Sequence, residues 1–443
     1  MKYIFFFIVI SITFLRGSGI HVPVDDPVYI YLERLATKGM LNDYNNNTLP
    51  LTRNDIAESL NQLQEKKTEL TPVEFSFLKE FLSEYRYELT SEKYHKISDE
   101  SSGLYFAFSN IENAFDGASE LLSYSPQSEE PRFIVYEKNG DRAWLNIGTM
   151  LRREMKGKSH RLAYTYHYDF SVSIGNNFSV FSSADLHSLV YNDDFTEDSN
   201  EFKGGFPLHN PGFYGYGTER SFEYAHAYLH YTSPYGDFTF ANEPIQWGNS
   251  LQPIILSDNV PPYPRIAWSK SLGKSRFSFF HANILPAASS SNAGLEYYDK
   301  KYLVGHRWEV SLSDKLEGAF TEILVYGGRE TELIYFIPPI FLWPVQHNMT
   351  SQSEDNILWF LEAQYTLLPD VKTYGTFMID ELRTSEMFND WGGNRWAVQA
   401  GIHFTHSLFS IPVDNRLEFT AVRPWAYTHR EPQFGTYTHN TRP

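Results

Sequence analysis

The sequence has no cysteine among its 443 residues. This absence excludes disulfide bonds, thiolate metal sites and a thiol nucleophile. After the first 15 residues there is no run of 18 or more apolar residues, which excludes a bundle of membrane-spanning helices. A transmembrane β-barrel is not excluded, because its strands carry apolar residues only at every second position.

Basic residues are also scarce, with 37 Lys and Arg against 54 Asp and Glu. Lys2, an apolar stretch from Tyr3 to Leu15 and small residues after it predict a signal peptide over 1–19, with a buried N-terminal strand as the alternative. Without this peptide the chain has 35 basic and 54 acidic residues, a net charge of −19. Nucleic acid is therefore not an expected partner. An exported chain without disulfides is typical of the bacterial envelope.

Signatures of catalysis are missing as well. The sequence has no HExxH or GxSxG motif, and Gly273-Lys274-Ser275 lacks the earlier glycine of a phosphate-binding loop. His226 and His230 have the spacing of a helical metal pair, but their segment is predicted to be a strand, where four residues span about 13 Å. The acidic loop 191–202 is interpreted as solvated, with calcium bridging to an anionic polymer as the alternative. We therefore expect no enzyme activity, no cofactor and no metal.

The segment 22–96 differs from the rest of the chain, because its apolar residues recur at helical spacing. Thr52 and Thr71 are each followed three residues later by an acidic residue, and these pairs predict helix starts. Gly39 is suited to end the first helix. We predict three short amphipathic helices in a small periplasmic domain, followed by a linker over 97–102.

From residue 103 onward the period of the apolar residues changes to two, most clearly in 162–170 and 396–404. Tight turn signals such as Asn139-Gly140 and Pro369-Asp370 alternate with long connections rich in aromatic residues and proline. This alternation is typical of an outer-membrane barrel with periplasmic turns and extracellular loops. A soluble β-sandwich or propeller, which requires no such alternation, is the alternative.

Seven tight turns predict 14 strands, and a lone strand from Gly103 to Ser109 makes 15. Bacterial single-chain barrels have even strand numbers. We therefore expect either a missed strand or a chain truncated before its final strands, and we favour truncation. The predicted fold is all-β, an antiparallel transmembrane β-barrel over 103–443 that lacks its last strands and follows the small N-terminal helical domain.

In such a barrel, the polar residues at alternate positions face the lumen. The residues assigned to this set are His167, Asp169, Glu223, Arg307, Glu309, Glu322, Glu362, Gln364, Gln399, His403 and Glu418. They form either a solvated or plugged interior, or a sugar-binding surface together with aromatic residues of the loops, because sugar rings stack on aromatic faces beside planar polar groups. Aromatic residues at strand ends have a second interpretation, as the girdle at the membrane interface.

Several segments resemble the capsule assembly Wzi family. The matching segments are Gln246-Trp247-Gly248, 256–259 with Pro264, Arg307-Trp308-Glu309-Val310, 322–329, Tyr335 with Pro338, Asp355-Asn356, 374–380 and 418–429. The resemblance implies an outer-membrane barrel of about 16 to 18 strands, preceded by a small helical periplasmic part and continued by further strands after 437–440. It also implies a surface lectin, not an enzyme, that attaches exported polysaccharide to the cell. The segment 29–63 faintly resembles an S-layer-homology unit, with a plain periplasmic plug or assembly domain as the alternative.

We therefore expect a protein of the bacterial outer membrane that binds surface or capsular polysaccharide through its extracellular loops and outer lumen. The candidate polysaccharide-binding residues are Trp247, Tyr263, Arg307, Glu322, Tyr326, Arg329, Trp343, Asp380 and Trp391. Outer-membrane lipid and lipopolysaccharide are the other expected partners, and we expect a monomer. The alternatives are a passive or substrate-selective porin and a non-functional truncated paralogue. Phe320, Tyr326 and Arg307, as bulky lumen candidates, favour an occluded lumen over a porin.

Overall fold

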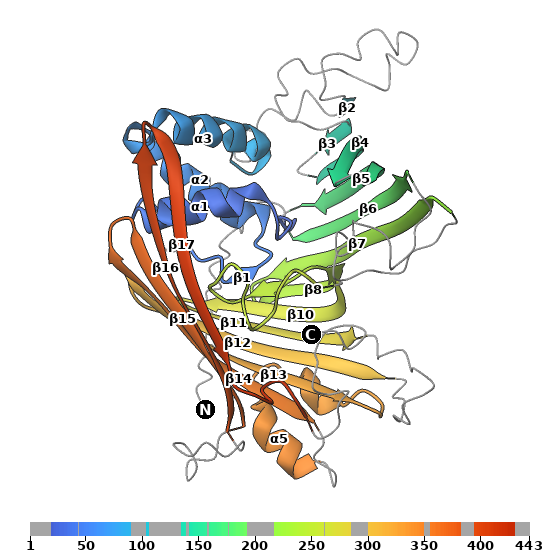
Figure 1. Ribbon diagram of the computed structural model, residues 1–443, viewed down its shortest axis with the longest axis vertical. Helices are drawn as coiled ribbons and strands as arrows, with labels where there is room; N and C mark the ends of the chain where they lie inside the picture. Colours follow the sequence, from blue (N-terminus) through green and yellow to red (C-terminus); the bar gives the residue numbers. More distant parts are fainter. Residues whose placement is uncertain are drawn as a thin grey trace, which may run out of the picture.

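The structure is a computed structural model, and it describes residues 19–42, 44–89, 103–105, 134–138, 141–156, 159–175, 177–192, 217–260, 262–284, 300–349, 355–381 and 394–429. These residues form one 15-stranded antiparallel sheet and a group of three N-terminal helices (Figure 1). None of the helices in the described ranges is long and apolar enough to cross a membrane. The predicted linker 97–102 and almost all of the predicted signal peptide lie outside these ranges.

The three predicted helices are confirmed as α1 (Pro27–Thr37), α2 (Arg53–Glu65) and α3 (Pro72–Glu84), with a short 3₁₀ turn η1 (Lys67–Glu69) between the last two. The predicted caps are present, because the hydroxyls of Thr52 and Thr71 accept hydrogen bonds from backbone N–H groups three residues later. Gly39 follows α1 at φ +79°, a conformation that favours glycine. Leucines and isoleucine from all three helices form one buried core.

The strands of the large sheet follow one another in sequence order, and each pairs with the next. They are β2 (Gly103–Tyr105), β3 (Ile134–Lys138), β4 (Asp141–Lys156), β5 (Ser159–Ile174), β6 (Phe178–Tyr191), β7 (Glu219–Ser233), β8 (Gly236–Glu243), β10 (Tyr263–Leu272), β11 (Ser275–Ile284), β12 (Lys301–Ser313), β13 (Leu316–Gly327), β14 (Asn356–Leu368), β15 (Val371–Glu381), β16 (Arg395–Leu408) and β17 (Ile411–Val422). The described residues contain the predicted number of 15 strands in this sheet, and the seven predicted tight turns each lie between two paired strands. A sandwich or propeller is ruled out, because it would divide these strands among separate sheets.

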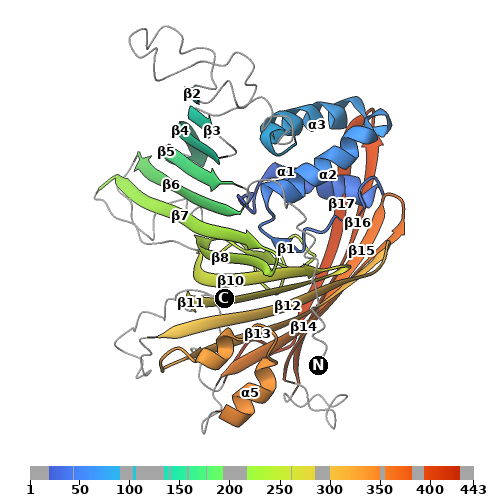
Figure 2. The same ribbon diagram turned by 180° about the vertical axis from the view of Figure 1, so that it is seen from behind.

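The sheet curls into a barrel wall whose two outermost strands, β2 and β17, are not paired with each other in the described part of the chain (Figures 1 and 2). The helices α1–α3 lie between these two edges, at the end of the barrel where the tight turns are. On one side, Glu33 of α1 forms ion pairs with Lys372 and Arg416 of β15 and β17. On the other, the Arg53 guanidinium at the start of α2 lies 5.6 Å from the ring of Trp144 in β4. The helices therefore bridge the gap between the edges.

Alternate residues of each strand face opposite sides of the wall. Tyr164, Tyr166 and Tyr168 are exposed on the outside, whereas Thr165 between them is buried. The predicted alternation is therefore confirmed, and its outer side is apolar and aromatic, as the wall of a membrane barrel requires.

Two of the polar residues assigned to the lumen face outward instead, and so do the bulky lumen candidates Phe320 and Tyr326. In β13 the odd-numbered residues face the lumen, as Thr321 shows by its 2.9 Å hydrogen bond from the lumen residue Arg307, so Glu322 is on the outer side. In β7, Glu223 shares its face with exposed Leu229 and Tyr231. Near the ends of these strands that join the long loops, both faces contain polar and apolar residues. The alternation of polar and apolar residues therefore predicted the wrong face for Glu322 and Glu223.

A second covering layer lies on the outside of the wall. Residues 328–349, here called the outer-wall cap, contain a 3₁₀ turn η3 (Leu333–Phe336) and the helix α5 (Leu342–Met349). Tyr335, Leu342 and Val345 pack on outward-facing residues of β11, β12 and β13, among them Phe279, Val304, Leu324 and Tyr326. In Figure 1, α5 lies at the opposite end of the molecule from α1–α3.

Candidate functional site

The lumen is crossed by the connection between β8 and β10, residues 244–260, here called the lumen loop. It contains the two-residue strand β9 (Gln246–Trp247), which leaves the wall and pairs with β1 (Thr48–Leu49) from the helical part. Trp247, Ile255 and Leu256 pack on inward-facing residues of β11–β14. The loop therefore has a core of its own inside the barrel.

Hydrogen bonds attach the tip of the lumen loop to the opposite wall. The Ser250 hydroxyl donates to the Gln399 side chain at 2.7 Å, and the backbone N–H of Leu251 donates to Glu418 at 3.0 Å. Glycine is required at position 248, because its φ is +130° and a Cβ atom there would lie 2.4 Å from Pro253. The loop reaches from β8 to β16 and β17 and occupies the lumen between them.

The N-terminal segment, residues 19–26, is held on the inner wall of β7 and β8. The His21 ring contacts the Glu243 carboxylate at 2.8 Å and the ring of His230 at 3.1 Å, and its backbone N–H donates to the Tyr228 hydroxyl at 2.7 Å. A Cβ atom on Gly19 would lie 2.2 Å from the His230 ring, so a larger residue there would require this ring to shift. This clamp places the segment inside the barrel.

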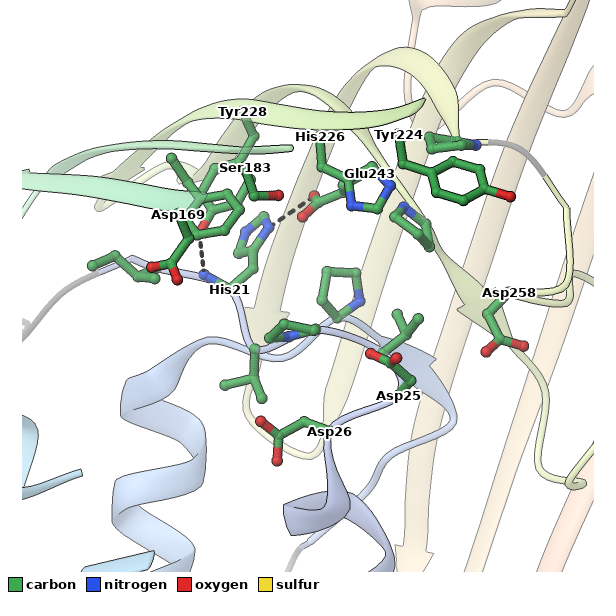
Figure 3. A pocket seen from close by; sticks show the side chains of 18 of the residues that line it. His21, Asp25, Asp26, Asp169, Ser183, Tyr224, His226, Tyr228, Glu243 and Asp258 are labelled. Carbon is green, nitrogen blue, oxygen red and sulfur yellow. Dashed lines mark hydrogen bonds and ion pairs between the residues drawn. The ribbon is translucent and has the colours of Figure 1, made fainter. Parts of the chain in front are cut away.

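A cavity of about 1010 Å³ lies between the N-terminal segment, the inner faces of β4–β8 and the lumen loop. Figure 3 shows Tyr224 and His226 reaching into it from the strands, Asp25 and Asp26 from the N-terminal segment, and Asp258 from the lumen loop. Its volume is at the upper end of the range of about 300 to 1,000 Å³ that ligand pockets have. The cavity can therefore hold a short oligosaccharide.

The lining combines acidic groups with flat rings. The acidic groups are Asp25, Asp26, Glu84, Asp169, Asp185, Glu243 and Asp258, and the rings belong to Tyr85, Trp144, Phe181, Tyr224, Tyr228 and three histidines. Within the described part of the chain, Arg53 is the one arginine among the lining residues, and none of the lysines lines the cavity. Carboxylates accept hydrogen bonds from hydroxyl groups and aromatic faces stack on sugar rings, so this lining favours neutral or amino sugars over acidic ones.

Two of the carboxylates are held in place by a histidine. The His167 ring lies 2.8 Å from Asp185 and 3.2 Å from Asp169, and Asp169 also accepts a hydrogen bond from the Trp144 indole at 3.0 Å. On the opposite side of the cavity, burial raises the pKa of the Asp26 carboxyl, although this group accepts a hydrogen bond from the backbone N–H of Val28. The carboxylates of the wall are thus preorganised acceptors. In the described residues, no group of three or more His, Asp or Glu is arranged to hold a metal ion.

The predicted polysaccharide-binding residues lie elsewhere, and the structure does not bring them together. Trp247, Tyr263 and Arg307 are buried on the lumen side, and Glu322 and Tyr326 are buried on the outer side beneath the outer-wall cap. Because they are buried, these residues contact other protein groups. A role in binding would therefore consist of positioning other residues.

The remaining candidates are closer to solvent. Arg329 holds the Asp355 carboxylate at 2.7 and 2.8 Å, and Asp380 accepts a hydrogen bond from the backbone of Tyr427 at 2.8 Å. Trp343 is exposed, and Trp391 lies outside the described residues. None of the eight described candidates lines the cavity, and their role in binding stays a prediction.

Three residues that line the cavity were named in the sequence analysis for other reasons. His167 and Asp169 were assigned to the lumen because they are polar, and His226 was considered because of its spacing from His230. Asp185 and Tyr224 are not among the predicted residues, although both occupy lumen-facing positions that strand alternation identifies. Asp258 belongs to the segment 256–259 that resembles the Wzi family, but it was not assigned to binding. Strand alternation could not identify Asp25 or Asp258, because no periodic pattern places the N-terminal segment or the lumen loop inside the barrel.

The curled sheet, the filled lumen and the apolar outer wall define a β-barrel protein with an N-terminal helical part. Its fold is similar to that of Wzi, described as an outer-membrane protein involved in group 1 capsule assembly in Escherichia coli and as a carbohydrate-binding β-barrel. The two share 14% identity over 95% of this chain and 77% of Wzi, with a TM-score of 0.51. The predicted resemblance is thus confirmed at the level of the fold.

The chain also matches a monoaromatic hydrocarbon channel, CymD, with 12% identity over 66% of this chain and 76% of the channel, at a TM-score of 0.22. That score is too low to support an argument. No protein-family model and no curated protein sequence matches the chain.

Proposed function

We propose that this protein is an outer-membrane β-barrel that binds a surface or capsular polysaccharide and attaches it to the cell. It acts by binding and not by catalysis, as a monomer surrounded by outer-membrane lipid and lipopolysaccharide, with α1–α3 on the periplasmic side. The fold similarity to a carbohydrate-binding barrel supports this proposal. The exposed apolar residues on the outside of β5, β8, β14 and β17 support the membrane location.

The filled lumen is the observation that favours a binding protein over a porin. A porin needs a continuous water-filled path, but the lumen loop and β1 lie across the middle of this barrel. The Thr48 hydroxyl accepts a hydrogen bond from Arg307 at 2.8 Å, and the Asn47 amide donates to Gln364 at 3.0 Å. These contacts join the helical part to the wall from inside and favour a barrel that binds without conducting.

The cavity is the proposed binding region. Its preformed carboxylates and rings can hold one part of a chain, and many weak contacts along a repeating polymer would add up to durable attachment. Because acidic groups dominate the lining, we expect a polymer of neutral or amino sugars to be retained and one rich in uronic acids to be repelled.

The test compares cell-bound with released polysaccharide in a deletion strain complemented with variants of this chain. We expect Tyr224→Ala to release polymer, because it removes a ring from the cavity. Tyr231→Ala should retain it, because Tyr231 lies on the outer side of the same strand. Immunoblots of the outer membrane check that both variants reach equal abundance. Full retention by Tyr224→Ala would argue against the cavity, and retention by the deletion strain itself would argue against the proposed function.

A further inference from the structure

The outer-wall cap has an unusual composition for a connection between strands. From Leu333 to Gln346 it has no charged residue. This stretch contains three prolines and nine residues that are Leu, Ile, Phe, Trp or Val. Its charged residues, Arg329, Glu330 and Glu332, come before this stretch, next to the ends of the strands. Charge is thus confined to the rim of the barrel, and the part that extends along the wall is uncharged.

Beneath the cap lie polar groups that face outward from the wall. The Glu322 carboxylate accepts hydrogen bonds from the backbone N–H groups of Leu342 and Trp343, at 2.8 and 3.1 Å, and from the Trp359 indole at 2.9 Å. Glu322 is only 1% exposed. Without the cap this carboxylate would face outward among apolar neighbours, which is costly in a lipid environment.

A histidine and a tyrosine are covered in the same way. The His281 ring lies 2.8 Å from the Tyr326 hydroxyl and stacks on Phe336 of the cap at 4.1 Å between ring centroids. Tyr335 of the cap donates to the Asp355 carboxylate at 2.6 Å. The inner side of the cap therefore covers the histidine of the wall and hydrogen-bonds to the carboxylate that precedes β14.

The outer side of the cap is apolar and open. Leu333 is 83% exposed, Ile337 46%, Phe341 62% and Trp343 48%. This surface continues the outer wall, because the ring of Trp343 lies 6.2 Å from that of Trp359, which lies 6.3 Å from Phe320. Phe320 pairs with Trp308 and Leu361, which are themselves exposed on the outside of β12 and β14. The cap and the wall thus present one continuous apolar surface.

We propose that the outer-wall cap is embedded in the membrane, with its exposed apolar side chains in contact with lipid acyl chains. The cap replaces a polar patch on the wall by a surface that lipid can solvate. On one side its backbone N–H groups donate hydrogen bonds to Glu322 and its Phe336 ring covers His281, and on the other side it exposes leucine, isoleucine, phenylalanine and tryptophan. This inference rests on the proposed membrane location. It goes beyond it, since the connection is assigned to the lipid and not to the aqueous surface where polysaccharide would be bound.

The absence of cysteine makes a direct test available. Leu333→Cys and Phe341→Cys, each carrying a nitroxide spin label, are reconstituted into phospholipid vesicles as full-length protein. The accessibility of each label to oxygen, which concentrates among acyl chains, is compared with its accessibility to a water-soluble nickel chelate. Leu361→Cys on the outer wall is the lipid reference, and Asp314→Cys, in the exposed turn between β12 and β13, is the aqueous reference.

We expect both cap labels to give the high oxygen-to-nickel ratio of Leu361→Cys. Cap labels that match Asp314→Cys while Leu361→Cys reports lipid would overturn this inference and leave the membrane location intact. If Leu361→Cys also reports water, the proposed membrane location fails, and this inference fails with it. Dipolar broadening at Phe341→Cys would show that a second copy covers the cap in place of lipid. Heat-modifiable migration in gels checks that each variant is folded.

Discussion

At the scale of single residues, Glu33 is the clearest link between the helical part and the barrel. Its buried carboxylate lies between Lys372, at 2.7 Å, and Arg416. Burial alone would raise the pKa of Glu33, but the two positive charges outweigh it and lower the pKa below its ordinary value of 4.5. The ionised form is thus the one that the folded protein stabilises.

We expect Glu33→Gln to loosen the helices by about 3 kcal/mol, because it leaves two largely buried cations without their partner. Thermal unfolding of the purified protein in detergent, followed by circular dichroism at a helical wavelength, measures this loss. Glu65→Gln is the control, because Glu65 is exposed at the end of α2. Equal stability of the two variants would contradict the proposed link.

The same ion pairs predict a dependence on pH. Because the pKa of Glu33 is lowered in the folded state, its contribution is fully present above the ordinary value of 4.5 and is lost as the pH falls toward the folded pKa. We expect the unfolding temperature of the helices in the parent protein to fall between pH 5 and pH 3, and that of Glu33→Gln to fall less. Parallel curves for the two proteins would assign the acid sensitivity to other carboxylates.

Arg307 is a predicted sugar-binding residue whose contacts in the structure are all with other protein groups. It is buried, ion-paired with Glu362, and hydrogen-bonded to Thr48 and Thr321. We expect Arg307→Ala to lower the free energy of unfolding by about 3 to 5 kcal/mol, because it leaves the Glu362 carboxylate buried and unpaired. The double variant Arg307→Met with Glu362→Met should recover part of this loss. The amount of polymer bound per folded molecule should stay unchanged. A loss of binding without a loss of stability would show that Arg307 takes part in binding.

At the scale of elements, local chemistry explains what could be predicted. The start of α2 and of α3 follows from Thr52 and Thr71, whose caps involve residues only three positions away. Tight turns separate paired strands that are neighbours in sequence, so the strand count also follows from local signals. The face of Glu322 could not be predicted, because Ile323 and Val325 on one side of β13 are as apolar as Leu324 and Tyr326 on the other.

The outer-wall cap depends on a single carboxylate for the start of its helix. We expect Glu322→Ala to free the backbone N–H groups of Leu342 and Trp343 and to cost α5 about 1 to 2 kcal/mol of local stability. Hydrogen exchange of these amides should then be about 5 to 30 times faster. Glu330→Ala is the control, because the Glu330 side chain is 84% exposed at the rim. Unchanged exchange at α5 would show that apolar packing alone holds the cap.

At the scale of the whole molecule, the filling of the lumen is the feature that the sequence predicted least. Bulky inward residues favoured occlusion, and Arg307 does face inward, but Phe320 and Tyr326 face the outside. The lumen is filled instead by the lumen loop and β1, through contacts such as that of Asn249 with the Gly375 carbonyl, 126 residues away in sequence. Contacts over such separations leave no periodic signal in the chain.

The filled lumen makes a prediction about ion conductance. In a planar bilayer we expect the parent protein to conduct little, because the lumen loop and β1 both lie across the path. Replacing residues 248–257 by a two-residue Asn-Gly connection removes the hydrogen bonds of Ser250 and Leu251 to β16 and β17. Conductance should then rise, while Lys315→Ala in an exposed turn leaves it unchanged. A steady open-pore conductance of the parent protein, equal to that of the shortened variant, would instead favour the porin. It would show that the lumen loop does not block the path of ions through the lumen.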